Sequence, residues 1–497
     1  MVSKRTRQLT RRTSMLTLAG ATAAVLAACG EPTVRVVGSP EEARGPAGPA
    51  GAQGAAGAAG APGAAGAKGS AGKTPQQVVL WTSWWGRGLP GTAGERAIGL
   101  QQLVDMWNDQ GTHITAVIEA TPPDTEQVSG LRAKIIAAYA ANQPPDIHDP
   151  AYFDSGLYGQ NGMLVDMQEF VKRDKEYADS LDDYFPFLLE TSYWEGKLWS
   201  LPWYSNADLP YTNLAHVRES GLEPLKLGYT WDDLVEYCKK LQTTHGAGAE
   251  TNKWAIGGVD NQVQFWNLLM QNGGQIYNKD FTKATFNSPE GVEAAQWAVD
   301  LFHKHQIHRP PGSWFSERGI DRPSFRQGQI TMFYETSARR IATWAEDIGG
   351  LENMYVTPSP TKKQPFAGNY GRNVLIFKSN PGRQEASWEF MRWLTATDQN
   401  AHYVASIVFL PGRKSIFNTP AWRKIEEEIP QFQTFVDAIN KYGYRPWHPN
   451  LGNHYRTVGD AVGKAFESSN VSVKTLLDET ARQVDVDLEK FRSTYKG

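Results

Sequence analysis

The sequence has few cysteines and a small net charge. The first argues against a disulfide-stabilised protein and the second against a nucleic-acid-binding protein. Only Cys29 and Cys238 occur among 497 residues, so the chain has no internal disulfide framework. Cys238 falls on the apolar stripe of a predicted helix, where we expect a small core side chain. The formal net charge is −3, so nothing favours nucleic acid as the main partner.

Motifs for metal ions and phosphates are missing as well. The sequence contains no HExxH, no calcium loop and no GxxxxGK[ST] phosphate loop. His303, His305 and His308 lie close together in the sequence, but the first two are two positions apart and diverge on a helix. We therefore assign these histidines to a solvated helix end and predict neither a metal nor a cofactor.

The apolar run at the N terminus, residues 15–28, is too short to span a bilayer, which needs about 20 apolar residues. It follows a basic head and ends in Leu26-Ala27-Ala28-Cys29. This ending resembles the bacterial lipobox. The resemblance implies that residues 1–29 are a lipoprotein signal peptide, with cleavage before Cys29 and lipid on its thiol. The alternative is a plain secretory signal with an incidental cysteine.

The signal peptide is compatible with two export routes. Thr10-Arg11-Arg12 resembles a twin-arginine signal, but Thr13-Ser14-Met15 lacks the Phe-Leu that usually follows, so an ordinary Sec signal is equally compatible. Either route places the mature chain at the cell membrane, anchored by lipid on the extracellular or periplasmic face. More than one acyl chain would be needed for firm anchoring.

Residues 45–74 repeat Gly-X-Y through roughly ten triplets. A glycine at every third position is what a collagen triple helix needs at its axis, yet proline occurs only at positions 46, 49 and 62. We therefore interpret residues 30–75 as a flexible or partly extended stalk and linker, in which the Gly-X-Y repeat alone would reach up to about 90 Å at ~3.1 Å per residue. Trimerisation through this stalk is the alternative, with the globular part itself monomeric.

The globular part begins near Gln76 and is too long for one hydrophobic core, so two lobes are expected. A buried strand at 78–85 is followed by a helix at 98–107, a strand at 113–119 and a helix at 127–141. Strands that alternate with helices favour an α/β fold with largely parallel sheets.

The stretch from Tyr193 to Leu241 carries the most specific pattern. A Glu-Gly-Lys turn precedes a short strand that stops at Pro202, and a helix ending at Gly221 leads to a Thr230-Trp231-Asp232 helix start. This order resembles bacterial extracellular solute-binding proteins of ABC importers, the maltose-binding-like class. The chain has Tyr-Thr-Asn at 211–213 where the family commonly has Tyr-Tyr-Asn.

Further segments resemble the same family and extend the similarity over most of residues 76–420. They are Pro144–His148, Gly162–Met167, Phe286–Glu290, Phe325–Met332 and Pro411–Arg413. The resemblance implies a two-lobed periplasmic-binding-protein type II fold, each lobe a mainly parallel sheet flanked by helices. Strands would cross between the lobes near Ser205–Tyr211 and again around Met354 and Thr395.

The implied lobes are residues 76–205 plus 355–397 for the N-terminal lobe and 206–354 plus 398–497 for the C-terminal lobe. By resemblance the chain is not an enzyme. It would capture a carbohydrate, either a mono- or oligosaccharide or a glycerol-phosphate-like polyol, by hinge closure and deliver it to ABC permease subunits.

Candidate ligand contacts are polar and aromatic residues in loops after strands, because ligands of open α/β sheets bind beyond the carboxyl ends of strands. Flat rings stack on sugar faces, while carboxylates, amides and guanidinium groups bind hydroxyls. The candidates are Trp84, Trp85, Asp149, Asp154, Trp203, Tyr204, Asn206, Glu335, Asn369, Tyr370, Arg372 and Arg413, with Trp266 and Trp314 as weaker choices. Trp203→Ala is expected to weaken ligand binding more than it lowers the melting temperature. Arg372 and Arg413 leave an anionic ligand open.

Two other functions stay open at this point. A lipid-anchored glycoside hydrolase also needs an aromatic cleft and two carboxylates, for which Asp154 and Glu335 are available. A surface adhesin would use the Gly-X-Y stalk as its main feature. Turnover of oligosaccharide would favour the hydrolase, saturable binding without turnover the importer component, and binding to a host or matrix polymer the adhesin.

Overall fold

The computed structural model describes residues 74–82, 99–120, 128–245, 253–310, 321–335, 337–442 and 448–495. Cys29, the Gly-X-Y stalk, Trp84, Trp85 and Trp314 lie outside these residues, so the interpretations made for them stay predictions. Within the described ranges, no helix combines the length and the apolar character that crossing a membrane requires.

The first sheet joins strands that are far apart in the sequence. Among the described residues its order is β12-β6-β11-β3-β1-β2. The strands are β1 (Gln76–Thr82), β2 (Ile114–Ala120), β3 (Ile147–His148), β6 (Leu201–Ala207), β11 (Asn369–Ile376) and β12 (Leu410–Pro411). β1 runs parallel to β2 and β3, as the alternation of strands and helices predicts, whereas β11 runs antiparallel to β3 and β6 because it returns from the other lobe.

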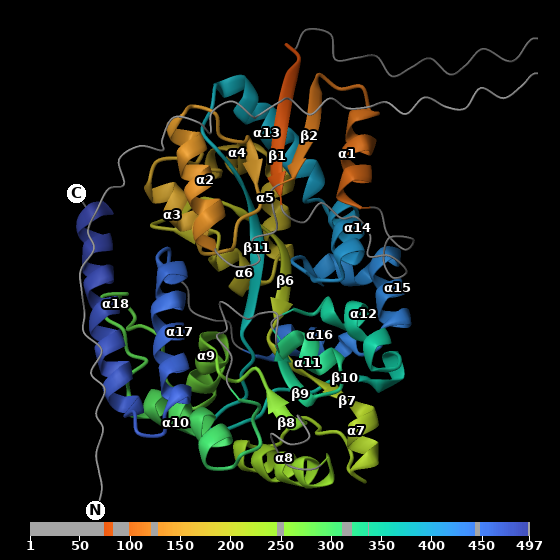
Figure 1. The fold of residues 1–497 in the computed structure, drawn as a ribbon. Helices are drawn as coiled ribbons and strands as arrows, with labels where there is room; N and C mark the ends of the chain where they lie inside the picture. Colours follow the sequence, from red (N-terminus) through yellow and green to blue (C-terminus); the bar gives the residue numbers. More distant parts are fainter. Residues whose placement is uncertain are drawn as a thin grey trace, which may run out of the picture. The chain divides into compact units, whose positions relative to one another are not determined.

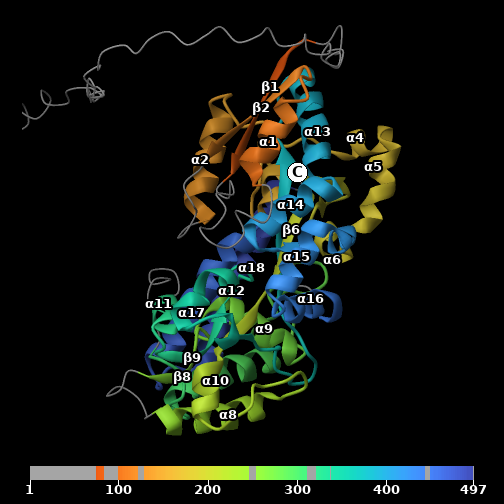
Figure 2. The same ribbon diagram turned by 90° about the vertical axis from the view of Figure 1, so that its right-hand side faces the viewer.

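Helices flank this sheet in the upper half of Figure 1. They are α1 (Leu100–Asn108), α2 (Val128–Ala140), α3 (Asp154–Gln160), α4 (Gln168–Arg173), α5 (Lys175–Asp179), α6 (Pro186–Glu190), α13 (Pro381–Leu394), α14 (Thr397–Ile407) and α15 (Pro420–Glu428). Trp107 of α1 contacts Phe390 and Trp393 of α13, each with ring centroids 5.4 Å apart. Figure 2 shows α1 and α13 together on this side of the molecule, with α14 and α15 following them.

The second sheet has the order β10-β7-β9-β8 in the described part of the chain. Its strands are β7 (Leu209–Asn213), β8 (Trp254–Gly257), β9 (Ile330–Glu335) and β10 (Met354–Val356). Its helices are α7 (Leu214–Glu219), α8 (Trp231–His245), α9 (Gln262–Gln271), α10 (Pro289–His303), α11 (Asp321–Arg326), α12 (Arg340–Trp344), α16 (Phe432–Lys441), α17 (Leu451–Glu467) and α18 (Val473–Tyr495). β8 and β9 are parallel, and β7 is antiparallel to both β9 and β10.

The start of α8 shows how the sequence specifies these elements. Thr230 and Asp233 exchange hydrogen bonds, with the Thr230 backbone N–H donating to the Asp233 carboxylate and the Asp233 N–H donating to the Thr230 hydroxyl. The predicted apolar stripe is confirmed, because Trp231, Leu234 and Cys238 are all buried. Burial raises the pKa of the Cys238 thiol, which fits its role as a core side chain.

Two strand connections link the sheets. Only Asp208 separates β6 of the first sheet from β7 of the second, and the chain crosses back between β10 and β11. Figure 1 shows β6 and β11 running from the upper sheet toward the lower one. β12 and α14 lie with the first sheet, because β12 pairs with β6 and α14 packs on α1 and α13. The predicted boundary at residue 398 therefore does not coincide with the edge of this sheet.

Candidate functional site

Three of the candidate residues come together where β3 ends, and we call Asp149, Tyr204 and Arg372 the hinge cluster. Asp149 directly follows β3, Arg372 lies on the neighbouring strand β11, and Tyr204 pairs with Arg372 across the β11–β6 ladder. Arg372 Nη1 donates a hydrogen bond of 2.8 Å to the backbone oxygen of Asp149 and lies 3.7 Å from Oδ2 of its carboxylate. The order of the sheet thus places a carboxyl, a guanidinium and a phenol side by side.

Burial controls the charge of Asp149. Its side chain is fully buried, which raises the pKa of the carboxyl to about 7, while the charge of Arg372 and a hydrogen bond from Thr82 act in the opposite direction. Burial lowers the pKa of the neighbouring His148 to about 4, so the imidazole is neutral at neutral pH. Since His148 Nδ1 lies 2.9 Å from the carbonyl oxygen of Trp81, this nitrogen carries the proton and donates it.

The second lobe contributes polar groups through the segment after β9. Asn206 Oδ1 accepts a hydrogen bond of 2.9 Å from the backbone N–H of Ala338, which ties β6 to this segment. Glu335 ends β9, and its Oε1 lies 3.9 Å from Nε of Arg340. Asn206 and Glu335 are buried, whereas the Arg340 side chain is 20% exposed.

Tyr204 belongs to the hinge cluster, and its hydroxyl also interacts electrostatically with Arg339 in the segment after β9. Burial raises the pKa of its phenol, so the hydroxyl is protonated at neutral pH, and the charges of Arg372 and Arg339 act against this rise. Arg372 belongs to the first sheet, and Arg339 immediately precedes α12 of the second lobe. The hydroxyl therefore lies within the electrostatic reach of cations from both lobes.

Asp154 lies in a different group. Its Oδ1 accepts hydrogen bonds of 2.5 and 3.0 Å from Nη2 and Nε of Arg132 on α2. The same guanidinium donates through Nη1 to Oδ1 of Asn453 on α17, at 3.2 Å. Asp154 thus takes part in a contact between the first lobe and α17.

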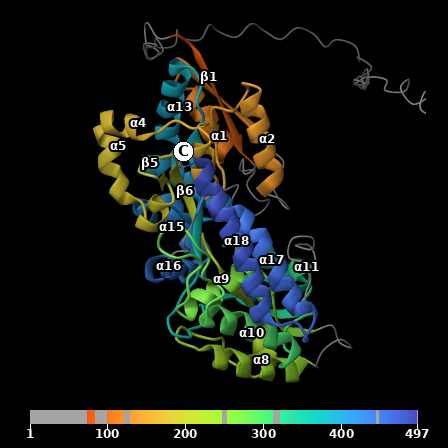
Figure 3. The ribbon, with the colours of Figure 1, turned by 90° about the vertical axis from the view of Figure 1, so that its left-hand side faces the viewer.

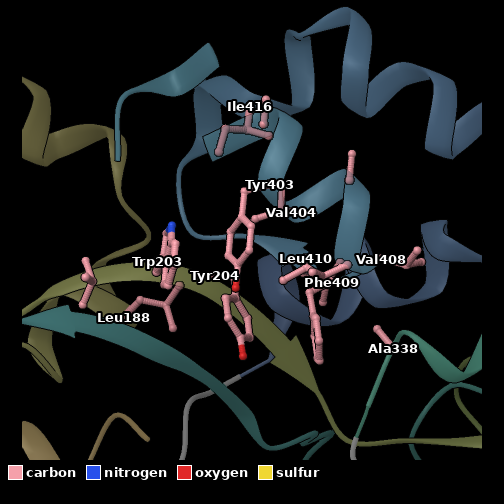
Figure 4. Close-up of a cluster of buried hydrophobic side chains, with 14 of the residues drawn as sticks. Leu188, Trp203, Tyr204, Ala338, Tyr403, Val404, Val408, Phe409, Leu410 and Ile416 are labelled. Carbon is pink, nitrogen blue, oxygen red and sulfur yellow. The ribbon is translucent and has the colours of Figure 1, made fainter. Parts of the chain in front are cut away.

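Three candidates contact protein rather than the hinge cluster. Trp203 is fully buried and stacks on Tyr403, with ring centroids 4.2 Å apart. Figure 4 shows the two labelled side chains next to each other. Asn369 Nδ2 donates to the carbonyl oxygen of Ala438, at 3.3 Å. Arg413 is buried inside the first lobe, where Nε donates to the Thr395 carbonyl oxygen and the guanidinium lies over the Tyr184 ring. The weaker candidate Trp266 is also fully buried.

Tyr370 is placed by its backbone. It pairs with Asn206 in the β11–β6 ladder, two residues along the strand from Arg372. Trp84 and Trp85, which follow β1, lie outside the described residues. No group of three or more histidine, cysteine, aspartate or glutamate side chains in the described ranges is arranged to hold a metal ion.

The chain matches the family model for a bacterial extracellular solute-binding protein over residues 93–401, which is more than half of its length. It belongs to this family. The solute-binding protein is 20% identical to the maltotriose-binding protein of Pyrococcus abyssi over 370 residues, covering 72% of this chain and 74% of that one. It is 25% identical over 421 residues to the sn-glycerol-3-phosphate-binding periplasmic protein UgpB of Rhizobium meliloti, covering 80% of this chain and 92% of that one.

Solved structures confirm the predicted fold of this solute-binding protein. The cyclic alpha-maltosyl-1,6-maltose binding protein from Arthrobacter globiformis superimposes with a TM-score of 0.68, at 22% identity, over 84% of this chain and all of that chain. The predicted family and the two-lobed type II fold are therefore both correct.

The sequence did not single out Arg132, Arg339, Arg340 or Asn453. Arg132 and Asn453 are far apart in the chain and carry no local motif, and their contact depends on how α2 and α17 approach. Arg339 and Arg340 follow the chosen Glu335 directly, so a wider window after β9 would have included them.

Proposed function

We propose that this solute-binding protein captures a carbohydrate or a glycerol-phosphate-like polyol between its lobes and delivers it to the permease of an ABC importer. The observation that carries the proposal is the meeting of the hinge cluster with the polar segment after β9. A carboxyl, a phenol and several guanidinium groups offer donors and acceptors for hydroxyls, and guanidinium groups also suit a phosphate.

The family relatives support this choice of ligand. One similar protein binds maltotriose and another binds sn-glycerol 3-phosphate, as their names state. Both ligands carry hydroxyls, many in maltotriose and two in sn-glycerol 3-phosphate, and the second also carries a negative charge that arginine side chains would stabilise. In the proposed mechanism, the ligand favours the closed arrangement of the lobes because it contacts both of them.

The location of the protein is part of the same proposal. Lipid on Cys29 would anchor the chain to the membrane, and the Gly-X-Y segment would serve as the linker to the globular lobes. We propose that the chain binds its ligand without turning it over. Asp154 and Glu335, the carboxylates that a hydrolase would need, each lie beside an arginine, at 2.5 and 3.9 Å.

The test is a thermal-shift series with maltotriose, sn-glycerol 3-phosphate and a dipeptide. A ligand at 100 times its Kd stabilises the native state by about 2.7 kcal/mol, so one of the first two should raise the melting temperature clearly. Arg372→Ala should abolish the shift. Arg173→Ala, which removes an arginine that is 54% exposed on α4, is the matched control and should keep it.

Two results would contradict the proposal. One is a shift with the dipeptide alone. The other is release of shorter sugars from maltotriose on prolonged incubation, which would favour the hydrolase instead.

A further inference from the structure

Helix α17 is packed firmly into the second lobe. It contacts α9, α10 and α18, and its Leu451 and Val458 belong to the same apolar cluster as Trp231 and Phe265. His454 Nδ1 lies 2.6 Å from the hydroxyl of Tyr277, within this lobe. The first turn of α17 therefore moves with the second lobe.

The first lobe nevertheless contacts this turn at several points. Arg132 of α2 donates to Oδ1 of Asn453, and Phe153 packs against Tyr455 with ring centroids 5.8 Å apart. Phe153 and its neighbour Tyr152 are buried in the apolar cluster of the second lobe, although they lie between β3 and α3 of the first. Polar and apolar contacts thus cross from one lobe to the other at the same turn.

Gly452 permits this close approach. A Cβ atom at this position would overlap Nη2 of Arg132 and would lie 2.9 Å from Cε2 of Phe153, both in the first lobe. At Gly463, about three turns further along the same helix, a Cβ atom would meet no other heavy atom within 4 Å. The two glycines lie on the same helix, but only at Gly452 would an added side chain collide with residues of the first lobe.

A second contact lies at the same end of the helix pair α17 and α18, just before the first turn of α17. Trp194 of the hairpin β4 (Tyr193–Trp194) and β5 (Lys197–Leu198) meets His448 at 5.3 Å and Phe491 of α18 at 6.4 Å. Figure 3 shows the upper end of α18 reaching the level of β5 and β6. The hairpin adds apolar contact between the lobes.

We propose that the first turn of α17, Leu451–Tyr455, is a clasp that holds the two lobes together before any ligand binds. Arg132 and Asn453 are its positioning residues, and Gly452 sets how far the lobes can close. The inference rests on the proposed function only in the sense that closure is taken to trap the ligand. In this view the clasp raises ligand affinity by populating the closed state in advance.

The experiment measures the distance between the lobes without ligand. Spin labels are placed at K172C on α4 and K474C on α18, where the native lysines are 67% and 56% exposed. Cys29 is replaced by Ser, and the buried Cys238 stays unlabelled. The full chain is compared with its Gly452→Ala, Asn453→Ala and Gly463→Ala variants by pulsed electron spin resonance.

Gly452→Ala and Asn453→Ala should each lower the short-distance population by at least about twofold, while Gly463→Ala should leave the distribution unchanged. Both glycine variants gain the same helix propensity, so only the contact with the first lobe distinguishes them. Circular dichroism confirms that each variant is folded. Identical distance distributions in all four proteins would overturn the clasp even if sugars bind, and a clasp that opens as expected stands even if no tested sugar binds.

Discussion

Two arginine–carboxylate pairs in this protein use the same chemistry at very different separations. Arg132 and Asp154 approach to 2.5 Å, whereas Arg372 lies 3.7 Å from the carboxylate of Asp149. Both carboxylates are buried. The close pair connects the first lobe with α17, and the loose pair leaves Asp149 with a pKa near neutrality. A close pair at a contact between the lobes and a loose pair in the hinge cluster thus occupy two different places in the molecule.

The support of the two pairs differs as well. Aromatic side chains pack around the hinge cluster (Figure 4). Trp203 stacks on Tyr403, and Tyr204 packs against Phe409 with ring centroids 4.7 Å apart. The Arg132–Asp154 pair is instead held by its own hydrogen bonds and by Asn453. Removing the aromatic support should therefore cost stability, and removing the polar contact should loosen the lobes.

The largest effect is expected from Trp203→Ala. Removal of this fully buried ring should lower the free energy of unfolding by about 3–5 kcal/mol, because a cavity opens beside Tyr403. Urea unfolding measures the loss, and Trp203→Phe, which keeps a ring, should lose less. The sequence predicted that Trp203→Ala weakens ligand binding more than it lowers the melting temperature. The full burial of Trp203 predicts instead that stability is lowered more. Loss of ligand binding at an unchanged melting temperature would restore that expectation.

Arg132→Ala should rank second, with a loss of about 2–4 kcal/mol, since it leaves the buried Asp154 without its cation. Asp154→Ala and the double variant complete a double-mutant cycle by urea unfolding. The coupling energy should be at least about 1 kcal/mol, because the residues are in direct contact. Additive single-variant effects would mean that the pair contributes nothing beyond its separate parts.

For the loose pair, Arg372 and Asp149, we predict a free energy of unfolding that depends on pH. Between about pH 4 and 7 the folded state keeps the Asp149 proton while the unfolded state has lost it, so the folded state binds more protons. The contribution of Asp149 to the free energy of unfolding therefore falls as pH rises through this window, by at most about 1.4 kcal/mol per pH unit. Above pH 7 the contribution is constant.

Histidines act in the opposite direction, so the Asp149 effect is measured as a difference. Burial lowers the pKa of His148 and His454 to about 4 and that of His448 to about 3, so these residues lower stability as pH falls below about 6.5. They are present in both the native protein and Asp149→Asn. The stability advantage of Asp149→Asn over the native protein should grow from pH 4 to 7, and a constant difference would contradict the raised pKa.

The fold was largely predictable from the sequence because its evidence is local. The N-cap at Thr230 and the apolar stripe through Cys238 each depend on neighbouring residues, and both helped to indicate the family. The predicted strand stop at Pro202 is wrong, because Pro202 lies inside β6 and pairs with Asn373 of β11. The hinge cluster was predictable in part, since Asp149 and Tyr204 follow or lie on strands whose ends meet in an open sheet.

Side-chain direction was not predictable in the same way. Trp203 and Tyr204 are adjacent on β6, yet only Tyr204 pairs with Arg372, because the β11–β6 register shifts at this point and leaves Trp203 stacked on Tyr403. Arg413 lies after a strand as expected, but its guanidinium turns into the first lobe toward Tyr184. The Arg132–Asn453 contact spans 321 positions and depends on how the lobes close, which no sequence window contains.

The smallest effect is expected at a third pair, Arg173 and Glu385, which has the same 2.5 Å separation as Arg132 and Asp154. Its side chains are 54% and 53% exposed, so water screens the charges and both side chains lose rotamer freedom when they pair. A double-mutant cycle should give a coupling below about 1 kcal/mol that shrinks further in 1 M salt. Equal couplings for the two pairs would show that separation alone decides their strength, whereas the structure attributes the difference to burial and to the second lobe that Arg132 contacts.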